Sequence, residues 1–167
     1  VGSREKIVVF SQWTSMLDIV QTCLSLDSTT LANGQVPVSY RRLDGSMSQQ
    51  DRSKAISHFN ADPKVQVLLL SLKAGGVGLN LTCASTCIMI DPWWNPSTED
   101  QAIDRVHRLG QTRPVHVYRF VCSGTVEERL LALQERKRGM AADALGGGAD
   151  KASGAKLSID ELRSFFL

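Results

Sequence analysis

The sequence predicts an α/β domain with one open, parallel β-sheet and helices on both of its faces. Five short apolar runs alternate along the chain with stretches of helical periodicity, an order typical of right-handed βαβ crossovers. The run QVLLLS at 66–71 is almost entirely apolar, and such a strand needs cover on both sides, as in a parallel sheet. The length of 167 residues and a hydrophobic content of 43% suit one domain with a substantial core.

The predicted strands are short and rich in β-branched and aromatic residues. They are expected at 7–10, 38–43, 66–71, 86–91 and 115–121. In an open parallel sheet, ligands bind beyond the carboxyl ends of the strands. The loops that leave this edge are therefore the candidate functional segments, and they lie at 11–12, 44–46, 73–78 and 92–96.

The predicted helices connect these strands and begin at residues that commonly cap helices. They are expected at 13–26, 48–59, 100–109 and 125–138. The expected N-caps are Ser48, then Ser97 or Thr98, then Thr125, with Asp51 and Glu128 as capping-box partners of the first and last.

Composition divides the chain into three parts. Residues 1–145 form the predicted α/β domain, and 146–157 are rich in Gly, Ala and Ser, which predicts a flexible linker. Residues 158–167 are expected to form a short amphipathic helix capped by Ser158. Its apolar side carries Ile159, Leu162, Phe165 and Phe166, and a helix this short needs a surface on which to dock.

The overall charge excludes two classes of protein. With 19 Lys and Arg against 17 Asp and Glu, the formal net charge is +2, which excludes a histone-like binder and a polyacidic tail. The four cysteines form no CxxC pair, which fits a reduced intracellular compartment, and Cys83 and Cys87 lack the partners of a metal site. No apolar run reaches membrane-spanning length, and without an initiating Met we expect a fragment of a longer protein.

The string QAIDRVHRLGQ, at 101–111, is the most informative segment. Arg105 and Arg108 are three residues apart on a predicted helix, so they share a face and could clamp a triphosphate with their planar guanidinium groups. A generic arginine pair is more often a solvated helix face, here with Asp104 pairing with Arg108. The complete string favours the phosphate clamp.

Two further strings lie at the same edge of the predicted sheet. In SLKAGGVGLNL, at 71–81, the glycines Gly75, Gly76 and Gly78 allow close approach of a ligand to backbone amides, although the chain contains no GxxxxGK[ST] phosphate loop. In IDPWWNP, at 90–96, we expect Trp93 to close the core and Trp94 to be exposed to a nucleic acid.

Together these strings resemble helicase motifs IV, V and VI of the Swi/Snf-type ATPases of helicase superfamily 2. The resemblance covers 6–138 and includes KIVVFSQWTSMLDIV at 6–20 and YRRLDGSMSQQDR at 40–52. The SLKAGGVGLNL string and the C-terminal tail are most similar to those of postreplication-repair translocases, such as the helicase-like transcription factors, and of transcription termination ATPases. Two features depart from the usual pattern, namely RLGQ in place of RIGQ and a longer loop at 27–37.

The resemblance implies a RecA-like fold of the P-loop NTPase superfamily, here the second lobe of a nuclear double-stranded DNA translocase. It implies that ATP with Mg²⁺ is held mainly by a first lobe outside this chain. Arg105 and Arg108 would be arginine fingers, and the helix at 158–167 would brace the first lobe. The resemblance places Gln101, Gly76, Gly78 and Asn80 at the ATP cleft, and Ser11, Gln12, Gly45, Ser46, Lys73 and Trp94 on the DNA.

The implied activity is chromatin remodelling, DNA repair or a transcription-linked role, with nucleosomes or replication and repair factors as further partners. This chain alone is expected to be inactive. Two alternatives remain, a lobe of a strand-separating helicase of the same superfamily and a non-catalytic docking module. The intact Arg105, Arg108, Gly76 and Gln101 argue against the docking module, because a scaffold would not need them.

Overall fold

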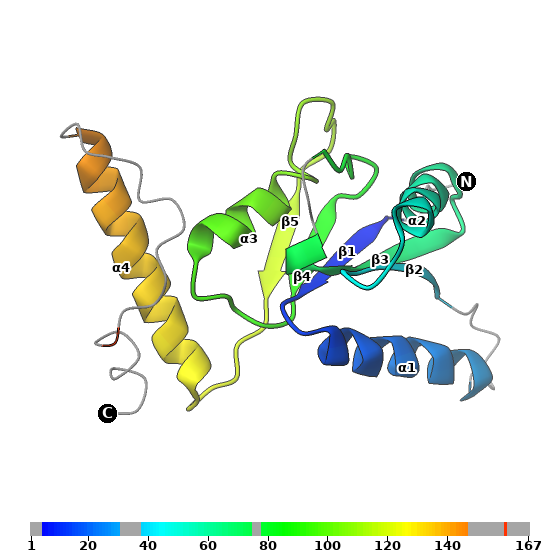
Figure 1. Cartoon of the computed structure of the whole chain (residues 1–167), viewed down its shortest axis with the longest axis horizontal. Helices are drawn as coiled ribbons and strands as arrows, with labels where there is room; N and C mark the ends of the chain where they lie inside the picture. The colour runs from blue at the N-terminus through cyan, green and yellow to red at the C-terminus, as the bar shows by residue number, and fades with distance from the viewer. Residues whose placement is uncertain (1–4, 31–37, 75–77, 147–158, 160–167) are drawn as a thin grey trace.

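The computed structural model describes residues 5–30, 38–74, 78–146 and 159, and it contains a five-stranded, fully parallel sheet (Figure 1). The strand order is β2-β3-β1-β4-β5, and every neighbouring pair is parallel. The predicted open α/β sheet is therefore confirmed, with each of the five strands in its expected place. The strands are β1 (Ile7–Ser11), β2 (Ser39–Leu43), β3 (Val65–Ser71), β4 (Thr86–Met89) and β5 (His116–Arg119).

Helices cover the two faces of the sheet unequally. One face packs against α2 (Gln49–Ala61) and α3 (Pro96–Ile103), and the other against α1 (Thr14–Thr30). Figure 1 shows α2 and α3 on one side of the strands and α1 on the other. The last helix, α4 (Val126–Gly146), packs against α3.

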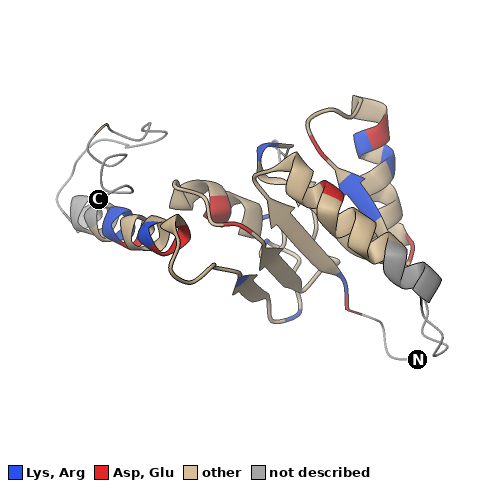
Figure 2. Ribbon diagram, turned by 90° about the horizontal axis from the view of Figure 1, so that it is seen from below, with Lys and Arg blue, Asp and Glu red and all other residues tan. Residues whose placement is uncertain are grey.

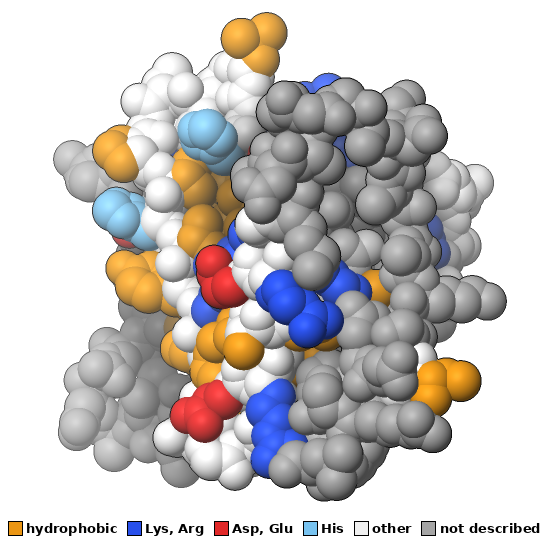
Figure 3. Space-filling model, turned by 90° about the vertical axis from the view of Figure 1, so that its left-hand side faces the viewer, with side chains coloured by type: hydrophobic (Ala, Val, Ile, Leu, Met, Phe, Trp, Pro, Cys, Tyr) orange, Lys and Arg blue, Asp and Glu red, His pale blue; other side chains and the backbone are white. Residues whose placement is uncertain are grey.

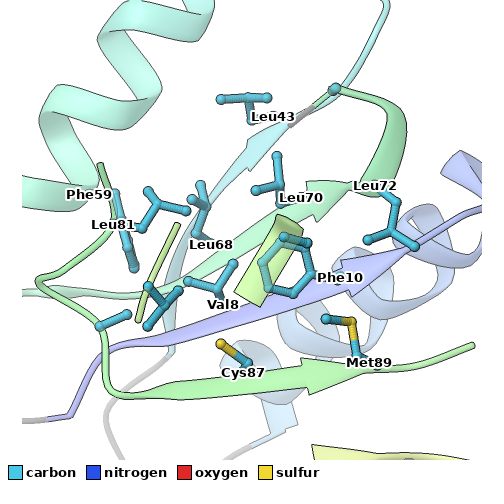
Figure 4. Packing of buried hydrophobic residues seen from close by; sticks show 14 of the residues in the cluster. Val8, Phe10, Leu43, Phe59, Leu68, Leu70, Leu72, Leu81, Cys87 and Met89 are labelled. Atoms are coloured by element: carbon cyan, nitrogen blue, oxygen red, sulfur yellow. The ribbon is translucent and has the colours of Figure 1, made fainter. Parts of the chain in front are cut away.

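The alternation of side chains along each strand explains the two cores. Val8 and Phe10 of β1 point to the α2 and α3 side, while Val9 points to the α1 side, as expected for a period of two. The larger core surrounds Phe10 and Phe59, which are almost fully buried (Figure 4). Burial of each such side chain contributes about 1.5–3 kcal/mol of hydrophobic stabilisation.

The third helix differs from its prediction at both ends. Its N-cap is Asn95, whose side chain accepts a hydrogen bond of 3.1 Å from the Ser97 amide, and Pro96 occupies the first helical position. The helix ends at Ile103, so Arg105 lies in the turns that follow it. The physical reason is tertiary, because the Arg105 carbonyl accepts from the Leu81 amide at 2.9 Å rather than continuing the helical ladder.

The fourth helix also begins differently from its predicted capping box. The Thr125 hydroxyl accepts from the Glu127 amide at 3.2 Å, while Glu128 accepts from the Ser123 hydroxyl at 3.0 Å. The helix continues past the predicted end at Arg138 as far as Gly146. Gly146, the first residue of the linker predicted at 146–157, belongs to α4 instead, and the rest of that linker lies outside the described residues, as does the predicted helix at 158–167 apart from Ile159.

Charged residues of both signs are distributed over the helices at the two ends of the sheet (Figure 2). Seen from the α4 side, apolar side chains lie among Lys, Arg, Asp and Glu on the described surface (Figure 3). None of the helices in the described part of the chain combines the length and apolar character of a membrane span.

Candidate functional site

Because all five strands run in parallel, their carboxyl ends meet at one edge of the sheet. Ser11 ends β1, Asp44 follows β2, Lys73 follows β3, and Asp91 lies two residues beyond β4. The candidate residues from distant parts of the sequence are therefore brought to one edge by the sheet topology.

Ser11, Gln12 and Asp91 form a buried bridge between β1 and the loop after β4. The Ser11 hydroxyl and the Gln12 amide, at 2.8 Å, both donate to the Asp91 carboxylate. Burial raises the pKa of Asp91 and outweighs these two hydrogen bonds, which act to lower it. The exposed fractions of Ser11 and Gln12 are 0% and 5%, so neither side chain reaches the surface expected of a DNA contact.

Asp44 shapes the loop that carries Gly45 and Ser46. Its carboxylate accepts from the Ser46 hydroxyl at 2.6 Å, from the Ser46 amide at 2.9 Å and from Arg42 Nε at 2.7 Å. These bonds, led by that of the Ser46 hydroxyl, lower the pKa of Asp44. Gly45 and Ser46 are exposed, and space around Gly45 is open, so this loop is accessible to a large ligand.

The glycine-containing segment is described from Gly78 onward, so Gly76 lies outside the described residues. Gly78 has a φ of 103°, a left-handed conformation that strains any residue with a side chain. The Asn80 carboxamide oxygen accepts from the amide of Thr82 at 3.1 Å and from its hydroxyl at 2.9 Å. Asn80 thus holds the turn after the glycines, while Lys73 just before them is exposed.

Arg105 and Arg108 lie on the turns next to this glycine segment. The backbones are joined by the Leu81–Arg105 bond, and the Arg108 guanidinium approaches the Leu79 carbonyl at 3.5 Å. Arg108 is exposed, and Arg105 is half-buried with a buried Nε that has no hydrogen-bond partner among the described residues. A buried, unpaired guanidinium nitrogen is costly unless a ligand accepts from it.

A hollow of about 40 Å³ lies beside Arg105, at the ends of β1 and β3. Thr98 and Gln101 of α3 line it together with Arg105, over an apolar floor that includes Phe10 and Leu72. The structure therefore brings Gln101 and Arg105 together at the carboxyl edge, although they do not share a continuous helix.

Gln111 joins the arginine turns to the segment after the glycines, and sequence reasoning missed it. Its Nε2 donates to the carbonyls of Thr82 at 3.2 Å, Ala84 at 2.7 Å and Val106 at 3.1 Å. Its oxygen accepts from the Arg113 amide at 3.0 Å. Gln111 is part of the QAIDRVHRLGQ string, but no pattern in the sequence indicates that its side chain lies beside residues 82–84.

The tryptophan loop is more enclosed than predicted. Trp93 packs against the larger core, as expected, but Trp94 is half-buried rather than fully exposed. The Lys137 ammonium lies 4.8 Å from the centroid of the Trp94 ring, so α4 partly covers it. The prediction of an exposed Trp94 is wrong in this respect, because the contact with Lys137 depends on the tertiary placement of α4, which no local pattern records.

Glu99 holds the tryptophan loop from inside the lobe, and no sequence pattern identified it as a functional residue. It is fully buried and accepts from the Trp93 amide at 2.7 Å, from Gln134 Nε2 at 2.8 Å and from Arg119 Nε at 3.0 Å. Gln134 of α4 also donates to the Trp93 carbonyl. One carboxylate thus connects α3, β5, α4 and the tryptophan loop.

Within the described residues, no group of three or more His, Cys, Asp or Glu is placed to hold a metal ion. Burial raises the pKa of the Cys87 thiol to about 12, and the pKa of Cys83 is raised mainly by burial as well. Both thiols are therefore in their neutral form at physiological pH.

Comparison with known proteins identifies relatives across almost the whole chain. Residues 1–110 match the family described as the helicase conserved C-terminal domain. The chain is 48% identical over 166 residues to the helicase-like transcription factor CHR28 of Arabidopsis thaliana, covering 99% of this chain and 16% of that protein. It is 54% identical over 133 residues to the DNA repair protein rad8 of Schizosaccharomyces pombe, covering 80% of this chain and 11% of that protein.

A solved structure agrees with these sequence relatives. The crystal structure of the C-terminal part of the Fun30 ATPase domain matches with a TM-score of 0.70 and 32% identity, covering 94% of this chain and 41% of that one. The chain spans less than one fifth of the length of the two curated relatives. By its sequence, its parallel sheet and this structural match, the chain belongs to the helicase conserved C-terminal domain family and is a RecA-like lobe of the Swi/Snf type.

Proposed function

We propose that this chain is the C-terminal motor lobe of an ATP-dependent double-stranded DNA translocase. The observation that carries the proposal is the joining of the glycine segment to the arginine turns through the Leu81–Arg105 bond and the Gln111 side chain, beside the hollow that Arg105 lines at the carboxyl edge. A lobe built this way links a phosphate-facing segment to a DNA-facing edge. The names of the relatives, which refer to DNA repair and helicase-like factors, support the same class of activity.

In this proposal Arg105 and Arg108 are arginine fingers for ATP held mainly by a first lobe, which also holds Mg²⁺. The residues present fit such a ligand, because the buried Arg105 Nε lacks an acceptor among the described residues and Arg108 is exposed nearby. Bound ATP supplies a phosphoanhydride bond, and Mg²⁺ neutralises part of its charge. The guanidinium groups would stabilise negative charge on the phosphate oxygens, with Gln101 orienting Arg105 from α3 and Gly78 and Asn80 shaping the adjoining turn.

The proposed DNA contacts lie along the same edge. The accessible residues Gly45, Ser46 and Lys73 would contact phosphates, and Trp94 would contribute the part of its ring that α4 leaves open. Ser11 and Gln12 are buried, so their part in DNA binding would be to hold the edge in shape through Asp91. Contacts of this kind are independent of base sequence and sensitive to salt.

The arginine assignment is tested in the full-length protein by DNA-stimulated ATP hydrolysis. We expect Arg105→Ala and Arg108→Ala each to lower kcat by about 10³-fold or more, the usual contribution of an arginine finger. Arg108→Lys should restore little of the lost ATPase activity, because a lysine lacks the planar fork of donors. Arg41→Ala is the matched control, since Arg41 lies on β2 and donates to the Tyr40 carbonyl. An ATPase rate near wild type in either alanine variant would show that the assignment is wrong.

The mode of movement needs a separate experiment. A duplex translocase displaces a third strand from a triplex without melting the duplex, whereas a strand-separating helicase releases single strands. We expect the full-length protein to displace the triplex strand with ATP and to leave a forked duplex paired. Release of single strands would instead support the alternative helicase. We further propose a nuclear location, with chromatin or replication and repair factors as partners.

A further inference from the structure

One part of the sheet carries apolar side chains that the described elements cover only in part. In β4 and the residue after it, Ile88 and Ile90 lie on the α1 side of the sheet and are half-buried. Beside them on β5, Tyr118 pairs in register with Ile88, and the Phe120 amide bonds to the Met89 carbonyl. The exposed fractions of Tyr118 and Phe120 are 54% and 57%. We name these four residues the β4–β5 face.

The placement of α1 explains why this face is open. One flank of α1 is hydrogen-bonded to side chains of β2. Asp18 and Gln21 accept from Arg42, and the Ser25 hydroxyl is hydrogen-bonded to the Tyr40 hydroxyl. The helix therefore lies over β1 and β3, and Figure 1 shows it running from β1 toward β2, away from β4 and β5.

The other flank of α1 is apolar. At about 100° per residue, the side opposite Asp18 carries Met16, Ile19 and Cys23, and 58% of Ile19 is exposed. Because the opposite flank is bonded toward β2, this apolar flank is turned toward the side of the sheet that carries β4 and β5. A parallel sheet is normally covered on both faces, so an open half-face of this composition indicates a missing cover.

We propose that residues 158–167 of this chain cover the β4–β5 face by laying their apolar side against it. Ile159, Leu162, Phe165 and Phe166 recur at helical spacing, and Ile159, which the structure describes, is 70% exposed. Ile159 and the two aromatic side chains of the face are thus apolar groups that the described residues leave exposed. This places the segment on its own lobe, whereas the family resemblance alone places it on the first lobe.

The length of the chain permits this return. The helix α4 begins six residues after Phe120 and is 21 residues long, which is about 30 Å. Residues 147–157 can span at most about 36–40 Å when extended. The chain leaving the end of α4 can therefore travel back the full length of that helix and reach β5 again.

Disulfide trapping in the full-length protein tests the proposal directly. In a Cys122→Ser background, we expect a Leu162→Cys variant to cross-link under mild oxidation to native Cys23 on α1 or to a cysteine introduced by Phe120→Cys. Ser164→Cys is the matched control, because its position lies on the polar side of the segment. We expect a yield about fivefold lower for the control, given the narrow geometry that disulfides require. Equal yields, no cross-link, or cross-linking to the first lobe would each overturn the proposal.

Hydrogen–deuterium exchange without added cysteines gives a second measurement. The double variant Phe165→Ser and Phe166→Ser should speed exchange in 86–90 and 116–120 by about tenfold, while Ser164→Ala should leave it unchanged. Unchanged exchange in the double variant would count against the docking. Neither measurement depends on ATP hydrolysis, so the outcome is separate from that of the proposed motor function.

Discussion

The amide of Leu81 donates a hydrogen bond of 2.9 Å to the carbonyl of Arg105. This bond joins the segment that follows the glycines to the segment that carries the two arginines, across more than twenty positions of sequence. It also marks where α3 has ended and the tighter turns have begun. The position of the guanidinium groups is therefore set by a neighbouring loop as well as by the helix that precedes them.

Gln111 is expected to stabilise this junction more than any exposed residue near it. Gln111→Ala removes the donor for three carbonyls and the acceptor for the Arg113 amide, so we expect a loss of about 2–3 kcal/mol in the free energy of unfolding. Urea unfolding measures it, with the exposed Thr112→Ala as control. A loss for Gln111→Ala no larger than that of the control would contradict the prediction.

Asp91 should make stability depend on pH in a defined direction. Its folded pKa is raised by burial, so the folded state binds its proton more tightly than the unfolded state does. The contribution of protonated Asp91 to folding stability is therefore complete below pH 3.8, the ordinary pKa of the carboxyl group. It is lost as the pH rises through the raised pKa of the folded state.

The variant Asp91→Asn does not titrate, and its side chain can still accept from the Gln12 amide and donate to the Ser11 hydroxyl oxygen. We expect its stability relative to wild type to increase between pH 3.8 and neutrality, measured by urea unfolding at several pH values. The exposed Asp104→Asn is the control. A difference between Asp91→Asn and wild type that stays constant with pH would show that Asp91 is not responsible.

Glu99 is expected to hold α4 to the rest of the lobe. Glu99→Ala removes the acceptor for Arg119, Gln134 and the Trp93 amide, and we expect a loss of about 3 kcal/mol. Glu99→Gln keeps one acceptor oxygen and should cost less. Thermal unfolding measures both variants, and a loss below about 1 kcal/mol for the alanine variant would show that α4 is held by other contacts.

Lys73 tests the proposed DNA edge. In the full-length protein, Lys73→Ala should weaken duplex binding by a similar factor for all sequences and reduce the slope of log affinity against log salt by about one. The control is Lys64→Ala, since Lys64 is exposed next to the start of β3, at the opposite edge of the sheet. Equal effects of the two substitutions would indicate that charge, rather than position, governs binding.

The sequence was sufficient to predict the sheet. Apolar runs such as IVVF at 7–10 form strands wherever both faces are buried, so their positions follow from local composition. The motif strings likewise indicated the family, because residue types and spacing are properties of the chain itself. The helix caps were less predictable. Proline is favoured at the first position of a helix, so the helix begins at Pro96 and Asn95, rather than Ser97 or Thr98, is its N-cap.

The sequence by itself determined the order of strands and helices, and with it the edge of the sheet at which Gly45, Lys73 and Gln101 lie. Tertiary structure alone decided that the helix stops before Arg105, that Trp94 lies against Lys137, and that Ser11 is buried on Asp91. The physical reason is that periodicity records which side of an element is buried, whereas hydrogen bonds and ring contacts depend on which distant segment lies opposite. Those partners are fixed only once the sheet has assembled.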